Sequence, residues 1–180
     1  MTKRRYNVKT ASLIAGLLAV ALYLLCFQLK SAKKIIFCKI LSSLLYVTQY
    51  ILLFAFVGAA MDAASVVTGA FAYKKDSPFV RKYKLPILIL TNAGIITIGL
   101  LLCENLFGLL AIAGVIFESA ACWMKTEKMI RIVSLFATPC WFTYNLIAGA
   151  YGSAIGTVLA AISIVTALVI YSRKKTEVTQ

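Results

Sequence analysis

Long apolar segments recur along this chain, and only short polar connections interrupt them. Hydrophobic residues make up 62% of the 180 positions and charged residues make up 14%, whereas soluble domains average about 45–50% apolar and about 25% charged residues. A soluble fold of this length could not bury so many apolar side chains, but a lipid bilayer can accommodate them. Because a spanning helix needs about 20 mostly apolar residues, the length predicts seven such helices and no separate soluble domain.

The predicted spanning helices occupy residues 11–29, 35–55, 60–73, 85–103, 106–124, 130–148 and 154–172. A turn at 56–60 separates the second from the third, because one helix over 35–73 would be far too long for a bilayer. The chain begins like a signal peptide, with Lys3, Arg4 and Arg5 before an apolar run. That run is long for a signal core and lacks a small-x-small cleavage site before Lys30, so we expect a retained helix.

The basic residues predict the orientation of the helices. Four of the 19 Lys and Arg residues lie in the N-terminal tail. The other fifteen lie in or beside the connections after the first, third and fifth helices and in the C-terminal tail. The positive-inside rule makes that side cytoplasmic, with the C-terminus inside and the short N-terminal tail translocated outside. The net charge of +13 then reflects topology and attraction to anionic lipids at the cytoplasmic face, and no nucleic-acid partner is expected.

The first three and last three predicted helices share one layout. Each set has a long helix, a basic loop, an aromatic-rich helix, a tight uncharged turn and a helix rich in small residues. A shift of 95 residues pairs Tyr23 with Glu118, Gln49 with Tyr144 and Tyr50 with Asn145. A shift of 94 matches other pairs, and chance likeness between apolar helices remains an alternative.

These features predict an all-α membrane protein with two parallel three-helix repeats joined by a linker helix. The first repeat spans residues 1–75, and the basic loop and linker helix span 76–104. The second repeat spans 105–175, and 176–180 form a polar tail. The single linker helix makes the two repeats run in the same direction, an arrangement that some transporters use.

The 3+1+3 layout resembles the SWEET and PQ-loop superfamily of small-solute transporters. The segment Cys140-Trp141-Phe142-Thr143-Tyr144-Asn145, followed by Ala148-Gly149 and Gly152, resembles the YgjV-type family of bacterial inner-membrane proteins. The segment from Tyr46 to Asp62 is similar too, so the resemblance covers nearly the whole chain. It implies a bacterial cytoplasmic membrane protein but no specific activity. The Pro-Gln dipeptide of the broader superfamily is absent, and Pro139 lies instead in the sixth predicted helix.

Two acidic residues fall inside predicted spans. Asp62 lies near the outer end of the third helix, and Glu118 lies in the cytoplasmic half of the fifth. Because ionisable side chains inside a membrane are costly and often functional, both are candidates for proton or cation coupling. Alternatively, Asp62 is an interfacial helix N-cap, and Glu118 is a neutral acid that holds helices together.

Burial disfavours the charged form of a carboxyl group. The nearest cations in the sequence, Lys125 and Arg131, should extend outward to the cytoplasm, so we expect Glu118 to be protonated. Its expected hydrogen-bond partners are Tyr23, Tyr144 and Asn145.

Polar and aromatic groups at equivalent depths in the two repeats predict a central cavity. Amide and phenol groups would bind a small polar solute, while aromatic faces would hold a ring or a cation. The candidate substrate-binding residues are Tyr23, Gln49, Tyr50, Glu118, Trp141, Tyr144 and Asn145. The same side chains could instead serve only as interhelical hydrogen bonds.

The expected function is transport or facilitated passage of a small polar solute. A non-transporting scaffold or lipid-binding subunit is the alternative, and a homo-oligomer remains open. The sequence has no histidine and five scattered cysteines without a C-x-x-C pair, which argues against zinc or haem. We expect free buried thiols, no metal or cofactor and no enzymatic activity.

Overall fold

The computed structural model describes the backbone of residues 2–103 and 105–177, and the side chains of residues 8–103 and 105–170. These residues form eight helices and no strands. The helices are α1 (Thr2–Gln28), α2 (Ala32–Leu52), α3 (Phe56–Tyr73), α4 (Pro78–Lys82), α5 (Lys84–Leu102), α6 (Gly108–Cys122), α7 (Glu127–Ile147) and α8 (Tyr151–Glu177).

Seven long helices match the seven predicted segments, although their ends differ by several residues. The turn between α2 and α3 lies at residues 53–55 rather than at 56–60, because Phe54 adopts a left-handed backbone conformation with a φ of 58°. The helix α3 therefore begins four residues earlier than predicted. The short helix α4 was not predicted. Ser77 caps it by accepting a hydrogen bond from the Val80 N–H group.

The two ends of the chain also differ from the prediction. The helix α1 begins at Thr2, so the N-terminal segment continues the first helix instead of forming a separate tail. The helix α8 extends to Glu177, so the predicted polar tail at 176–180 begins as helix, and residues 178–180 lie outside the described part of the chain.

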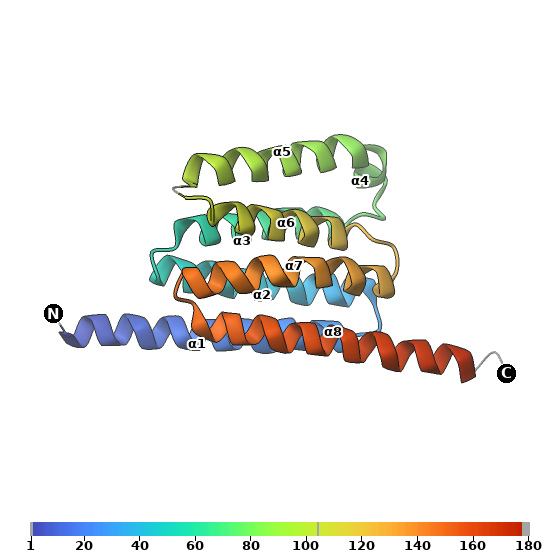
Figure 1. The fold of residues 1–180 in the computed structure, drawn as a ribbon. Coiled ribbons are helices and arrows are strands. Elements are labelled where there is room, and N and C mark those ends of the chain that lie inside the picture. Colours follow the sequence, from blue (N-terminus) through green and yellow to red (C-terminus); the bar gives the residue numbers. More distant parts are fainter. Residues whose placement is uncertain (1, 104, 178–180) are drawn as a thin grey trace.

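The long helices lie side by side in one bundle (Figure 1). We call α1–α3 the first triplet and α6–α8 the second triplet. Neighbouring helices pack within each triplet, and α1, α2 and α3 contact α8, α7 and α6, respectively, across the bundle. The helix α5 packs against α3 and α6 at one edge (Figure 1). We call the end with connections 29–31, 74–83 and 123–126 the basic end, and the other the opposite end.

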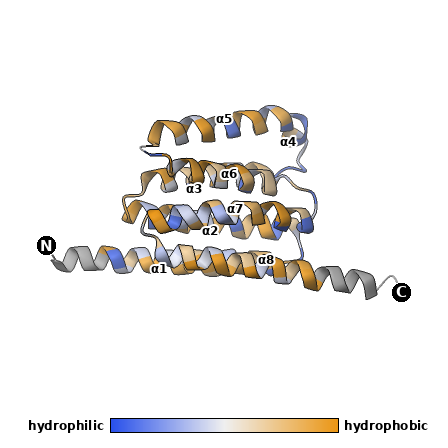
Figure 2. Ribbon diagram, in the orientation of Figure 1, coloured by the Kyte–Doolittle hydropathy of each residue, from blue (hydrophilic) through white to orange (hydrophobic). Residues whose placement is uncertain are grey.

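The bundle has the polarity expected in lipid, with apolar side chains outside and many polar ones inside. Figure 2 shows hydrophobic residues along the long helices and hydrophilic ones in the connection that carries α4. Large apolar side chains such as Leu90 and Leu101 are exposed, whereas Ser42, Gln49 and Ser134 are almost completely buried. Since lipid supplies the apolar surroundings, the interior can hold the hydrogen-bonding groups.

Within the described residues, five helices are long and apolar enough to cross a membrane. They are Val8–Gln28, Ala32–Leu52, Phe56–Tyr73, Lys84–Leu102 and Tyr151–Ile170. The helix α6 is apolar but has 15 residues, and α7 carries Arg131 and several polar side chains on its buried face. The helix α6 packs against the candidate spans α3 and α5, and α7 packs against α2 and α8, so the chain is an integral membrane protein.

Candidate functional site

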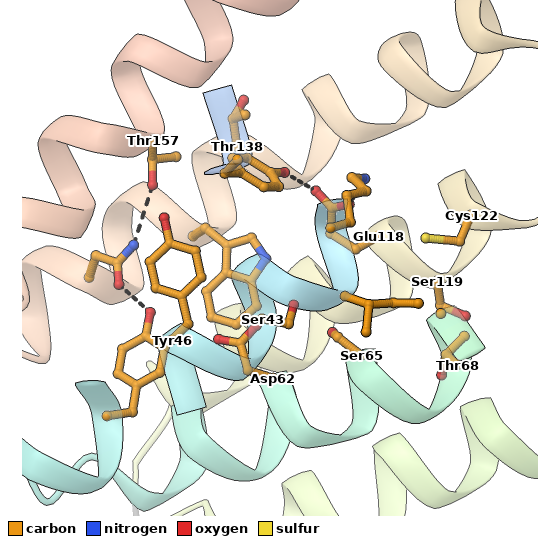
Figure 3. A pocket seen from close by; sticks show the side chains of 17 residues that line it. Ser43, Tyr46, Asp62, Ser65, Thr68, Glu118, Ser119, Cys122, Thr138 and Thr157 are labelled. Atoms are coloured by element: carbon orange, nitrogen blue, oxygen red, sulfur yellow. Dashed lines mark hydrogen bonds and ion pairs between the residues drawn. The ribbon is translucent and has the colours of Figure 1, made fainter. Parts of the chain in front are cut away.

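A cavity of about 60 Å³ lies at the centre of the bundle. Side chains from all six helices of the two triplets line it, and none comes from α5. The lining is formed by Tyr23, Lys39, Ile40, Ser43, Tyr46, Tyr50, Asp62, Ser65, Thr68, Gly69, Glu118, Ser119, Cys122, Thr138, Trp141, Asn145 and Thr157 (Figure 3). A single water needs about 10–15 Å³ of such space, so the cavity can hold a solute of only a few heavy atoms.

The part of the cavity nearer the basic end contains a buried ion pair. The Lys39 ammonium contacts the Glu118 carboxylate and donates a hydrogen bond of 2.7 Å to Ser134. The Tyr23 hydroxyl donates to Glu118 over 2.5 Å. The rings of Tyr23 and Phe27 lie 5.8 and 5.4 Å from the ammonium nitrogen, within cation–π range. We call Tyr23, Lys39, Glu118 and Ser134 the Glu118 layer.

This ion pair corrects the expectation for Glu118. The sequence argument predicted a protonated, hydrogen-bonded acid with no cation nearby, whereas Lys39 supplies a cation in direct contact. Of the three predicted partners, Tyr23 is confirmed, while Tyr144 and Asn145 bond elsewhere. Lys39 was counted among the charges on the cytoplasmic side because it lies near the start of its helix. Its side chain instead points into the bundle and is almost fully buried.

A second set of bonds joins the triplets nearer the opposite end. The Tyr50 hydroxyl donates to the side-chain oxygen of Asn145, and the side-chain amide nitrogen of Asn145 donates to the Thr157 hydroxyl over 3.3 Å. The Gly58 N–H group donates to the Tyr144 hydroxyl over 2.8 Å, and Ser153 donates to the Gln49 carbonyl oxygen over 2.6 Å. We call Gln49, Tyr50, Gly58, Tyr144, Asn145 and Ser153 the Asn145 layer.

Asp62 lies between these two layers. It is the seventh residue of α3, whose N-cap is Ala55, so the interpretation of Asp62 as an interfacial N-cap is wrong. The carboxyl group is buried, lies beside the Ser43 hydroxyl and lines the cavity (Figure 3). The error follows from the early start of α3, which places Asp62 nearly two turns inside the helix rather than at its end.

Aromatic rings form one wall of the cavity. Tyr50 stacks between Tyr46 and Trp141, with ring centroids 6.3 and 6.4 Å from its own. The indole of Trp141 lies against the bare backbone of Gly114, where an added Cβ would be 2.9 Å from the indole nitrogen. The small residue thus allows α6 to approach α7 closely, which fixes the position of the indole.

Five of the seven predicted substrate-binding residues line the cavity: Tyr23, Tyr50, Glu118, Trp141 and Asn145. The other two, Gln49 and Tyr144, are absent from the lining and belong to the Asn145 layer. The cavity also includes Lys39, Ser43 and Tyr46, which were not predicted. Their spacing with Tyr50, at three and four residues, places them on one face of a helix. This periodicity in α2 was the signal that could have identified them.

Several polar contacts connect residues exactly one repeat shift apart. Hydrogen bonds join Tyr23 to Glu118, Lys39 to Ser134 and Tyr50 to Asn145, and each pair is separated by 95 positions. The cavity lining also contains the pairs Ser43 and Thr138, Tyr46 and Trp141, and Asp62 and Thr157, which have the same separation. Residues that the 95-residue shift makes equivalent therefore face one another across the centre of the bundle.

Cations bind the carbonyl groups at the ends of α1 and α6. Arg131 donates to the carbonyl oxygens of Phe27 and Leu29, at 3.1 and 3.0 Å. Lys75 donates to those of Cys122 and Met124, at 3.2 and 2.5 Å. These bonds satisfy terminal carbonyls and place positive charge at the negative ends of the helix dipoles. Partial burial lowers the pKa of the Lys75 ammonium.

The position of Arg131 corrects another expectation. It was predicted to extend toward the cytoplasm, but its side chain is almost fully buried between the helix ends. The cysteines are free thiols as expected, although only Cys26 and Cys122 are buried.

The comparisons with known proteins agree with the membrane character of the bundle. The model of the family Imp-YgjV, described as a bacterial inner membrane protein, matches residues 10–175. No curated protein and no solved structure matches the chain. The family match covers nearly the whole chain, including every residue of the cavity lining, so the chain belongs to the Imp-YgjV family of bacterial inner membrane proteins.

Proposed function

We propose that this protein transports, or facilitates the passage of, a small polar solute through the cavity between two parallel three-helix repeats. The cavity itself carries the proposal. It is central, it is lined by both triplets, and its lining combines hydroxyl, amide, aromatic and charged groups. A scaffold or lipid-binding subunit has no need for a buried polar cavity, since such groups are costly to place in a membrane interior.

The helix contacts support the repeat arrangement. In two repeats, α1 corresponds to α6, α2 to α7 and α3 to α8. The contact between α1 and α8 then corresponds to the contact between α6 and α3. The contacts of α2 with α1 and α3 likewise correspond to those of α7 with α6 and α8. All these contacts are present, as expected for two repeats related by an axis along the membrane normal.

The hydrogen bonds support the same relation at the level of single residues. The 95-residue shift converts the Gln49–Ser153 bond into the Tyr144–Gly58 bond, and both are present. The same shift relates Phe27 and Leu29 to Cys122 and Met124, and a cation binds the backbone carbonyl oxygens of each pair. A shift of 94 residues relates neither the two hydrogen bonds nor the two pairs of carbonyl groups.

The two layers of bonds suggest how passage would be controlled. The Glu118 layer and the Asn145 layer each join the first triplet to the second, on either side of Asp62. In the proposed function, each layer would act as a barrier between the space beside Asp62 and one face of the membrane. In the proposed cycle the two layers open alternately, and a tilt of one triplet against the other breaks one set of bonds at a time.

Uptake into proteoliposomes tests the proposal. Purified protein is reconstituted and assayed with a panel of radiolabelled neutral, anionic and cationic solutes of a few heavy atoms. Ser65→Trp fills the cavity and should abolish the flux. Val67→Trp is a matched control, because Val67 lies two residues away on the same helix and is exposed. Failure to detect flux of any solute, or equal flux through both variants, would refute the proposal.

The orientation is part of the same proposal. Most basic residues lie at the basic end, which we assign to the cytoplasm by the positive-inside rule. A cysteine introduced by Ser77→Cys in a cysteine-free background should react with a membrane-impermeant maleimide in inside-out vesicles and not in intact cells. Labelling from the periplasmic side would reverse the assignment.

A further inference from the structure

The charges around the cavity do not balance. The charged side chains in its lining are Lys39, Asp62 and Glu118. Lys39 and Glu118 neutralise each other. Among the described residues, the only other ion pair joins Lys33 to Asp76 at the surface. An ionised Asp62 therefore leaves one uncompensated negative charge in the cavity.

A buried carboxylate without a counter-ion is strongly disfavoured inside a membrane. It must either take up a proton or have a cation beside it. The titratable groups that interact electrostatically with Asp62 are Tyr46 and Tyr50 from α2, Glu118 from α6 and Tyr144 from α7. Tyrosine hydroxyls are neutral at physiological pH, and the cation in the cavity lining, Lys39, is already paired with Glu118.

The surroundings of Asp62 supply hydrogen-bond acceptors. Ser43 lies beside the carboxyl group, and Ser65 and Thr68 follow along the same face of α3 (Figure 3). Each hydroxyl oxygen has lone pairs that can accept a hydrogen bond from an ammonium group. The hydroxyl of Ser119, which also lines the cavity and is almost fully buried, has no hydrogen-bond partner among the described residues.

The aromatic wall adds a second kind of cation recognition. Tyr46, Tyr50 and Trp141 line the same cavity as Asp62, and ring faces attract cations, most strongly when both are removed from water. An organic ammonium can contact a carboxylate through its N–H groups and aromatic rings through its methyl groups. An anion would meet no free positive group, because Lys39 is already bound to Glu118 and Ser134.

We infer that the cavity binds a small organic ammonium ion, with the Asp62 carboxylate as its counter-ion and the rings of Tyr46, Tyr50 and Trp141 as its apolar wall. The inference rests on the proposed function and assigns its substrate class. The cavity volume of about 60 Å³ restricts the ion to the size of methylammonium or its close homologues. Thr157, which the 95-residue shift places opposite Asp62, carries no charge, so one ion binds per chain.

Binding of radiolabelled methylammonium to the full-length protein in detergent tests the inference. Wild-type protein should bind the ion saturably, and Asp62→Asn should weaken binding at least tenfold. Asparagine has the shape of a protonated aspartic acid, so this variant should remain folded, as size-exclusion chromatography and thermal unfolding can verify. Asp76→Asn, which removes an exposed acid, should bind like the wild type. Tyr46→Leu should weaken binding about fivefold through loss of the ring face.

Three outcomes would overturn the inference: no methylammonium binding by the wild type, equal binding by Asp62→Asn, or tighter binding of Na⁺ in competition. The liposome assay separates this result from the proposed function. Flux of a neutral solute without ammonium binding would overturn the inference and leave transport intact. Binding that depends on Asp62 without flux of any solute would support the inference and refute transport.

Discussion

At positions 95 residues apart, the first and second triplets carry polar side chains that differ in charge. Lys39 of the first triplet contacts Ser134 of the second, and Tyr23 contacts Glu118. The cation and the anion of the Glu118 layer therefore come from different triplets. Either triplet paired with a copy of itself would carry only one of these two charges. The centre of the bundle is held together by complementary groups at equivalent positions, and the following predictions test this difference.

Removal of one charge from the ion pair should have the largest effect. In Glu118→Gln, the Lys39 ammonium loses its counter-ion while it stays buried, which should lower the free energy of unfolding by about 3–5 kcal/mol. The double variant Lys39→Met/Glu118→Gln removes both charges and should recover most of this loss. Thermal or denaturant unfolding in detergent measures both changes.

The surface pair of Lys33 and Asp76 is the matched control for this experiment. The two groups are 3.5 Å apart and both side chains are exposed. Lys33→Met should therefore cost about 1 kcal/mol or less. If Glu118→Gln and Lys33→Met lowered the free energy of unfolding equally, the ion pair of Lys39 and Glu118 would not be a main contact between the triplets.

The cations at the helix ends should give an intermediate effect, and an unequal one. Arg131→Met removes charged hydrogen bonds to buried carbonyl groups at the end of α1, which should cost about 1.5–3 kcal/mol. Lys75→Met removes the equivalent bonds at the end of α6, but Lys75 is only partly buried, so its loss should cost less. A larger loss of stability in Lys75→Met than in Arg131→Met would contradict this dependence on burial.

The Asn145 layer should show the smallest of these effects. Tyr50→Phe removes the hydroxyl that donates to the Asn145 carbonyl oxygen, and a buried unpaired acceptor costs about 1–2 kcal/mol. Tyr46→Phe is the control, because the Tyr46 hydroxyl has no hydrogen bond to any described residue. The two variants can be compared by their unfolding midpoints, and a larger loss from Tyr46→Phe would rule out this role for Tyr50.

The helices could be predicted because their signal is local. Each apolar run is bounded by charged or small residues, and most helix ends fall within a few positions of the expected ones. The start of α1 and the end of α8 differ more, because both helices continue into the polar ends of the chain. The contact between Tyr23 and Glu118 was also predictable, since the repeat shift made the two residues equivalent. The turn at Phe54 could not be predicted, because its left-handed conformation is favoured in glycine and not in phenylalanine.

The cavity was only partly predictable because a sequence does not state where a long side chain ends. Lys39 lies near the basic end of α2, and a lysine there can equally extend to the membrane surface. Its inward direction depends on Glu118, which is 79 residues away in the chain. The alternative interpretation of Asp62 as an N-cap was wrong for a related reason, since a shift of four residues in the start of α3 converts an end position into a buried one.

The helix α5 buries only Ile95 and Gly99 and adds nothing to the cavity lining. In the proposed arrangement of two parallel three-helix repeats, each set of three antiparallel helices would end on the side of the membrane opposite to where it began. A second repeat in the same chain could then keep the direction of the first only after one more crossing. Two separate identical chains could associate without that crossing, but both would then carry lysine at the place of Lys39 and Ser134, and two like charges would meet. With α5 as that crossing, both proposed repeats would lie in one polypeptide, where a mutation can alter one member of each facing pair and leave the other unchanged.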